Sequence, residues 1–182
     1  MRRGRLALAL ATLAGGCSGA GGRAGGDDGT GAAAEPIAPG QAAPAFTLKG
    51  LDGQDVPLAS FRGKAVLLSF WGVGCGFCRE EVPALKRFQE RYGPKGFTVL
   101  AVNVYNEPNM TVQAFVKEKG INYPVLLSGR SVGLKYGIPG TPSSFYLDPE
   151  GRVASSKFGR EEESEMEAAV KAILPKAPAA GG

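Results

Sequence analysis

Two continuous apolar runs lie in the middle of the chain, at residues 65–71 (AVLLSFW) and 97–104 (FTVLAVNV). Because these runs are short and do not alternate with polar residues, they predict strands buried on both faces of a sheet. Between them, apolar residues recur every three or four positions, which predicts a helix with one buried side, formed by Cys78, Val82, Leu85, Phe88 and Tyr92. A strand–helix–strand unit of this kind places its two strands parallel to each other.

Shorter elements extend this unit on both sides. An Asp-Gly turn between residues 46–48 and 54–56 predicts a β-hairpin at the start of the folded region. After the second apolar run, periodic apolar positions predict a helix at 109–119. A short strand at 123–127 and a short helix at 131–136 are expected to follow.

A second hairpin and a final helix complete the pattern. Residues 144–147 and 153–158 read as strands joined by the turn sequence Asp-Pro-Glu-Gly. The helix is expected over 161–174, where Glu161, Glu162 and Glu163 would complement the positive end of the helix dipole. This succession predicts an α/β domain with a central mixed β-sheet, flanking helices and an N-terminal β-hairpin.

The residue counts limit the chemistry that such a domain can perform. The 182 residues include three Cys and no His. Catalysis by a Ser-His-Asp or Cys-His pair is therefore excluded, and so is a metal site with His ligands. Three Cys are also too few for a zinc or iron–sulfur site built from Cys alone. We expect no metal and no cofactor other than a redox-active disulfide.

Residues 1–16 have the pattern of an export signal. Three Arg among the first five residues precede nine apolar residues at 6–14, a helix of about 14 Å that is too short to span a membrane. The small residues before Cys17 resemble the lipobox of bacterial lipoproteins, which predicts a lipid anchor on that Cys. Ordinary signal cleavage without a lipid is the alternative. Removing the signal lowers the formal net charge from +4 to +1, and no basic stripe for nucleic acid remains.

The following segment, residues 17–40, is rich in Gly and Ala and contains no aromatic residue. It lacks the apolar surface needed to offset the entropy of ordering, so it predicts a flexible linker. The folded domain is expected over 41–174, and residues 175–182 read as a disordered tail.

The chemistry of the chain is expected at Cys75 and Cys78, where the first buried strand gives way to the helix. Unpaired N–H groups at a helix N-terminus stabilise a thiolate, so Cys75 would be the nucleophile that attacks a disulfide. Cys78, one turn along, would resolve the resulting mixed disulfide. A zinc site at this pair is disfavoured, because zinc needs two more ligands and the chain offers no His and no further Cys pair. A purely structural disulfide stays open as an alternative, although so short a loop stabilises least.

Two longer motifs resemble the thioredoxin superfamily, and within it the membrane-tethered TlpA/ResA-like redoxins. They are residues 70–83 (FWGVGCGFCREEVP) and 137–148 (GIPGTPSSFYLD), and the start of the domain at 46–64 is similar to that of the same branch. The resemblance covers 41–174 and implies a thioredoxin-like fold with a central αβ insertion at 109–127. Gly74 departs from the branch, which usually carries Trp before the first Cys.

The resemblance also implies roles for individual residues. Pro142 matches the family's cis-proline, and the backbone of Thr141 would pair with an extended substrate. Trp71 is a candidate for the same substrate-binding surface, although packing in the core is the favoured interpretation. Glu81 matches an active-site acid, three residues after Cys78 on the same helix, and would exchange a proton with that Cys. A solvated surface role for Glu81 is the alternative.

These features together predict an extracytoplasmic thiol–disulfide oxidoreductase that is anchored to the membrane by lipid. The resemblance implies a monomeric reductase whose partners are disulfide-containing envelope proteins and a membrane electron donor, with apocytochrome c maturation as the process. A net disulfide-forming oxidant and a redox-inert binding module on the same fold are the alternatives. A peroxiredoxin is disfavoured because its motif residues are absent before Cys75.

Overall fold

The computed structural model describes residues 37–175. The predicted signal peptide, the lipidation site Cys17, most of the predicted linker and residues 176–182 of the tail lie outside this range. Inside it, the backbone N–H of Gly40 donates to the carbonyl of Val153 at 2.7 Å. Ala42 forms a β-bridge with Arg152, so the described chain enters the domain along one strand edge.

The sheet has five strands in the order β5-β4-β3-β6-β7. β3 (Ala65–Trp71) and β4 (Phe97–Asn103) are parallel over seven residue pairs, as predicted. β3 is antiparallel to β6 (Ser143–Leu147), and β6 is antiparallel to β7 (Val153–Phe158). The sheet is therefore mixed. A separate hairpin of β1 (Thr47–Lys49) and β2 (Asp55–Pro57) precedes it, at the predicted place.

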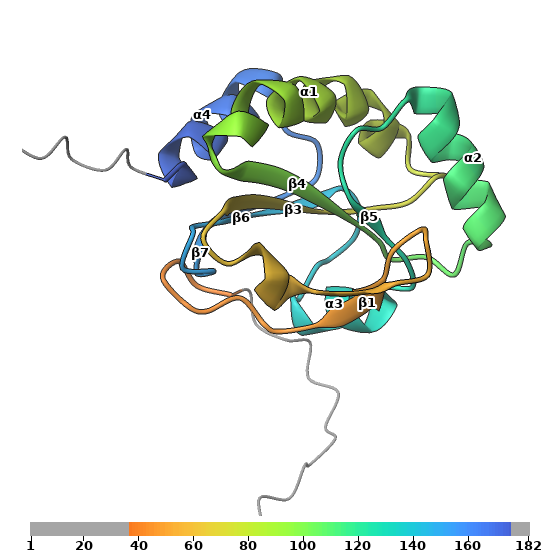
Figure 1. Cartoon of the computed structure of the whole chain (residues 1–182), viewed down its shortest axis with the longest axis horizontal. Helices are drawn as coiled ribbons and strands as arrows, with labels where there is room; N and C mark the ends of the chain where they lie inside the picture. Colours follow the sequence, from red (N-terminus) through yellow and green to blue (C-terminus); the bar gives the residue numbers. More distant parts are fainter. Residues whose placement is uncertain (1–36, 176–182) are drawn as a thin grey trace, which may run out of the picture. The chain divides into compact units, whose positions relative to one another are not determined.

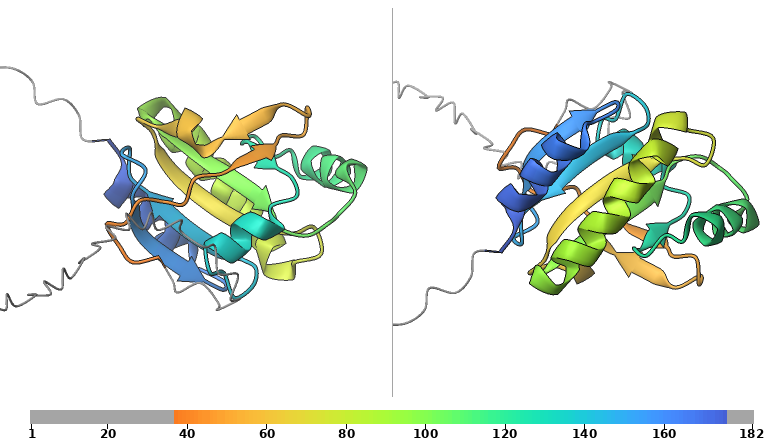
Figure 2. Two further views of the ribbon diagram at one scale, coloured as in Figure 1. Left: turned by 90° about the horizontal axis from the view of Figure 1, so that it is seen from below. Right: turned by 90° about the horizontal axis from the view of Figure 1, so that it is seen from above.

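The helices cover both faces of this sheet (Figure 1). α1 (Gly76–Tyr92) and α4 (Glu163–Ile173) lie side by side on one face, as the view from above in Figure 2 shows. α3 (Arg130–Lys135) and the β1–β2 hairpin cover the other face. The remaining helical elements are α2 (Asn109–Lys119) and two short 3-10 turns, η1 (Leu58–Phe61) and η2 (Gly93–Lys95). These layers form the predicted thioredoxin-like α/β fold.

Every residue of β3 and β4 is buried, because the sheet has a hydrophobic core on each face. Successive side chains of a strand point to opposite faces. Leu67 and Trp71 therefore join the core beneath α1 and α4, whereas Leu68 and Phe70 join the core beneath α3 and the hairpin. The unbroken apolar runs in the sequence reflect this double burial.

Two elements differ from the sequence-based prediction. β5 is only Val125–Leu126, shorter than the predicted strand at 123–127, because its ladder with β4 has only two residue pairs; on its other side Leu126 forms an isolated bridge with Gly50. α4 begins at Glu163 rather than at 161. Glu161 is therefore not in the first turn of the helix, and the prediction that it complements the helix dipole there is wrong. Among residues 37–175, no helix is both long and apolar enough to cross a membrane.

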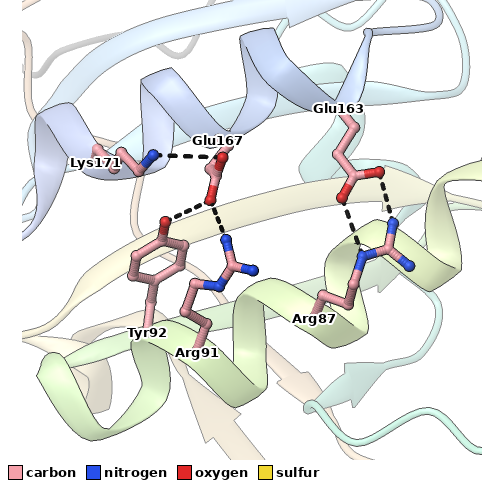
Figure 3. A network of polar contacts seen from close by, with 6 residues as sticks. All are labelled: Arg87, Arg91, Tyr92, Glu163, Glu167 and Lys171. Carbon is pink, nitrogen blue, oxygen red and sulfur yellow. Dashed lines mark hydrogen bonds and ion pairs between the residues drawn. The ribbon is translucent and has the colours of Figure 1, made fainter.

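Polar contacts fix α4 against α1 (Figure 3). The guanidinium of Arg87 donates to both carboxylate oxygens of Glu163, at 3.0 and 2.6 Å. Arg91 and the hydroxyl of Tyr92 both donate to Glu167, at 2.5 and 2.7 Å. Isolated exposed ion pairs contribute little to stability, but the paired geometry fixes how the two helices lie relative to each other.

Candidate active site

Cys75 and Cys78 form a disulfide at the start of α1. Cys75 is the N-cap residue, and its Sγ accepts a hydrogen bond from the backbone N–H of Cys78 at 3.2 Å. Because the first N–H groups of a helix have no intrahelical partner, this position stabilises negative charge on the Cys75 sulfur. A thiolate at Cys75 is therefore favoured once the disulfide is reduced.

The two cysteines differ in accessibility. Cys75 is half-buried, whereas Cys78 is 4% exposed and packs in the core beneath α1. Only Cys75 can meet the disulfide of another protein. Cys78 can reach only the sulfur of Cys75, which is the arrangement needed for release of a mixed disulfide.

Glu107 holds the loop that leads to Cys75, and the sequence-based prediction missed it. Its carboxylate accepts hydrogen bonds from the backbone N–H of Val73 at 3.1 Å and of Gly74 at 3.4 Å. The side-chain amide of Asn103 also donates to it, at 2.5 Å. A signal was available: Glu107 follows β4, and the carboxyl ends of the parallel strands β3 and β4 meet at one edge of the sheet.

An open groove lies beside Cys75, lined by Gly74, Cys75, Gly76, Phe77, Tyr105, Glu107 and Thr141. Phe77 is 53% exposed and Tyr105 is 47% exposed, so two aromatic rings face solvent at this groove. A side chain at Gly74 would meet no neighbouring atom. The position at which the resemblance led us to expect Trp is therefore open to solvent at its Cβ.

The loop of Thr141 and Pro142 contributes Thr141 to the lining of the same groove. The Thr141–Pro142 peptide bond is cis, as the resemblance implied. The hydroxyl groups of Tyr105 and Thr141 are 3.2 Å apart, within hydrogen-bond distance. The structure thus brings Cys75 and Thr141 to one groove, while Pro142 is buried directly behind it.

Trp71 lies below this surface rather than on it. Its side chain is buried, and its ring packs on Phe115 with a centroid distance of 5.3 Å. The indole N–H has no hydrogen-bond partner in the described part of the chain. Trp71 also lines a small cavity that reaches Cys78 and Tyr123. This placement agrees with the core interpretation, and any effect of Trp71 on substrate binding would be indirect.

Glu81 is buried although it is a carboxylic acid in the middle of a helix. It is 6% exposed, and its Oε1 accepts a hydrogen bond from the backbone N–H of Glu161 at 3.3 Å. Burial raises the pKa of Glu81 from 4.5 to about 7. The hydrogen bond from Glu161 opposes this rise in pKa, and the nearby Glu161 charge adds to it. Glu81 is therefore not a solvated surface residue, and it can both bind and release a proton near neutral pH.

No group of three or more His, Cys, Asp or Glu side chains converges to hold a metal ion within residues 37–175. The reactive groups assembled at this end of α1 are thus the Cys75–Cys78 disulfide and the buried acid Glu81.

Comparison with known proteins agrees with this arrangement. The model of the Redoxin family matches residues 38–174. Thiol-disulfide oxidoreductase ResA of Bacillus subtilis (strain 168) is 34% identical over 142 residues, which are 78% of this chain and 79% of that protein. ResA of Bacillus thuringiensis (strain Al Hakam) is 31% identical over 137 residues, or 75% and 79% of the two chains.

A solved structure extends the likeness to three dimensions. A DsbE-type thiol:disulfide interchange protein from Chlorobium tepidum superposes with a TM-score of 0.72 at 30% sequence identity, covering 76% of this chain and 99% of that one. Residues 38–174, which the Redoxin model matches, contain the sheet, the helices and the CxxC disulfide described above. The chain therefore belongs to the Redoxin family, as a thioredoxin-like thiol–disulfide oxidoreductase related to ResA.

Proposed function

We propose that this protein works as a reductase that donates electrons from the Cys75–Cys78 dithiol to disulfides of proteins in the cell envelope. The observation that carries the proposal is the unequal pair: a half-exposed Cys75 at a helix start, beside an open groove, and a buried Cys78 behind it. An exposed nucleophile and a protected resolving thiol suit a cycle that ends with release of the reduced partner.

The cycle conserves atoms and electrons. The Cys75 thiolate attacks one sulfur of the partner disulfide, and the other partner sulfur leaves as a thiolate. Cys78 then loses its proton and attacks the Cys75 sulfur, which expels the second partner thiolate. The partner gains two electrons, and Cys75–Cys78 becomes a disulfide. A membrane electron donor returns it to the dithiol by the same exchange chemistry.

The resemblance to the TlpA/ResA-like branch supports apocytochrome c as a substrate, because the cysteines of its CxxCH motif must be reduced before haem attaches. The groove beside Cys75 supports binding of an extended segment, which the backbone at Thr141 would meet as an added strand. The sequence of residues 1–17 supports export and lipid anchoring at Cys17.

Trapping of partners tests this proposal. Cells that express Cys78→Ser should accumulate mixed disulfides between Cys75 and envelope proteins, since the resolving thiol is missing. Cys75→Ser is the matched control and should capture nothing covalently. Partners with CxxCH motifs among the trapped proteins would support the cytochrome role. No covalent capture by Cys78→Ser would contradict the reductase, and equal non-covalent capture by both variants would indicate a binding module instead.

The direction of electron flow needs a second measurement. A reduction potential clearly above about −150 mV would indicate a net oxidant instead of a reductase. For the anchor, Cys17→Ala should move the protein from the membrane fraction to the soluble fraction of the envelope. Unchanged membrane association of that variant would contradict lipidation.

A further inference from the structure

Glu161 is a second buried acid beside Glu81, and the reductase cycle described above does not use it. Glu161 lies in the connection between β7 and α4 and is 9% exposed. The hydroxyl of Tyr146, in β6, donates to its Oε2 at 2.7 Å. Its backbone N–H donates to Glu81 Oε1, as described above. Glu161 lies eighty positions after Glu81 in the chain, and its backbone donates the hydrogen bond that orients the Glu81 carboxylate.

The arrangement is held in place by the helices around it. The paired contact between Arg87 and Glu163, two residues after Glu161, fixes the start of α4 on α1 (Figure 3). Glu81 and Glu161 line one polar cavity that opens to solvent between these elements. Both carboxyl-bearing residues therefore border the same solvent-accessible cavity.

Two observations relate Glu81, one member of the pair, to Cys78. Glu81 lies three residues after Cys78 on α1, so the two side chains share one face of the helix. The negative charge of Glu81 also contributes, after burial, to raising the pKa of Tyr123. Tyr123 and Cys78 line the same small cavity, so Glu81 acts on that cavity electrostatically.

The charges around the pair determine its response to pH. Burial raises the pKa of Glu161 as well, and the hydrogen bond from Tyr146 opposes this rise. The other titratable or charged groups that face Glu81 or Glu161, or line their cavity, are Glu80, Arg87, Tyr123, Lys157, Arg160, Glu162, Glu163 and Glu165. The charge of Glu161 opposes ionisation of Glu81, so the titration of Glu81 depends on the protonation state of Glu161.

We propose that Glu161 is a positioning residue of the redox site: it orients Glu81 and shares a proton with it, so that the pair passes the Cys78 proton to solvent. The proposal rests on the reductase cycle. When Cys78 attacks the mixed disulfide, its proton goes to the Glu81 carboxylate, and Glu81 then releases it to water in the cavity that it shares with Glu161. No electron is exchanged in this step.

A single-turnover reaction isolates the resolving step. Reduced protein is mixed with one equivalent of the chromogenic disulfide dithiobis(nitrobenzoate). Attack by Cys75 releases one coloured thiolate, and attack by Cys78 on the mixed disulfide releases the second. The rate of the second release is measured between pH 5 and pH 9 for each variant, with the fold of each variant checked by circular dichroism.

For the wild type, the second release should become about tenfold faster from pH 6 to pH 8, because a base whose pKa is near 7 becomes deprotonated in that range. Glu161→Gln removes a neighbouring negative charge, which lowers the pKa of Glu81 and should reduce the increase to less than about fivefold. The exposed Glu150, which neither faces the pair nor lines its cavity, provides the matched control, and Glu150→Gln should keep the wild-type increase. Glu81→Gln should lose the inflection near pH 7.

Tyr146→Phe gives a second approach in which both carboxyl groups are kept. Loss of the phenolic donor raises the pKa of Glu161, so the shared proton stays there more often and the inflection again moves to lower pH. If the wild type releases only one thiolate, the reductase cycle itself is wrong, and this inference with it. If the wild type releases two but Glu161→Gln and Tyr146→Phe leave the pH profile unchanged, only the role of Glu161 is refuted.

Discussion

Replacement of Glu81 by Gln should make the protein more stable at neutral and alkaline pH. In the folded protein the pKa of Glu81 is raised from 4.5 to about 7, mainly by burial. The unfolded chain releases this proton near pH 4.5, so between these two pH values the folded state holds more protons. Stability must therefore fall as the pH rises through this range. Gln is uncharged, so its burial carries no cost of ionisation, and its side-chain oxygen can accept the hydrogen bond from the N–H of Glu161. The variant should therefore not lose stability in this way as the pH rises.

The size of the effect follows from the difference in pKa. One pKa unit corresponds to about 1.4 kcal/mol, so the penalty in the wild type is about 1 kcal/mol at pH 5 and about 3 kcal/mol at pH 8. The stability of Glu81→Gln relative to the wild type should thus increase by about 2 kcal/mol between these pH values. The residue is almost fully buried, so solvent screening removes little of this difference.

Urea unfolding of the oxidised protein at pH 5, 6, 7 and 8 measures the effect, since the free energy of unfolding is obtained at each pH from the same transition. Glu90→Gln, at an exposed position farther along α1, is the matched control and should follow the wild type at every pH. A stability difference between Glu81→Gln and the wild type that stays constant from pH 5 to pH 8 would refute the raised pKa, and with it the basis for proton transfer to Cys78.

Three further predictions follow from the site and the core. Glu107→Ala removes the carboxylate that accepts hydrogen bonds from the backbone of the loop before Cys75, and it should lower the kcat/KM for a disulfide peptide about tenfold. Glu107→Gln keeps a side-chain oxygen as acceptor and should retain most of this kcat/KM. Equal losses of kcat/KM in the two variants would refute the positioning role. Gly72→Ala places a methyl group against the ring of Tyr105 and should raise the KM for the same peptide several-fold, whereas Gly74→Ala meets no neighbour and should not. Phe145→Ala should lower the free energy of unfolding by about 3–5 kcal/mol in urea, because its ring is fully buried among other aromatic rings; a loss below about 1 kcal/mol would contradict that packing.

The groove beside Cys75 also bears on partner choice. A Cβ atom at Gly74 would meet no other atom within 4 Å, and the groove that Gly74 lines also carries two exposed aromatic rings, Phe77 and Tyr105. Aromatic side chains with exposed faces are typical of surfaces that bind other proteins. In the proposed cycle, a partner would therefore meet open space at Gly74 and these two rings beside the disulfide at the start of α1.

The sequence by itself determined the elements and the reactive cysteines, because the signals for both are local. Continuous apolar runs specify the buried strands β3 and β4, and the spacing of three and four specifies α1. A CxxC at a strand–helix junction places one thiol at the helix N-terminus and the other one turn inside. None of these inferences requires knowledge of residues far away in the chain.

Only the tertiary structure decided which acids join Glu81 and which acid binds the loop before the disulfide. Glu161 reads in the sequence as one of three glutamates at a helix start, yet packing of α4 on α1 buries it against Glu81 and Tyr146. Glu107 reads as a loop residue, yet it holds the backbone before Cys75. Burial and the pairing of charges depend on how distant segments pack, and a desolvated carboxyl group has a pKa that its local sequence does not encode.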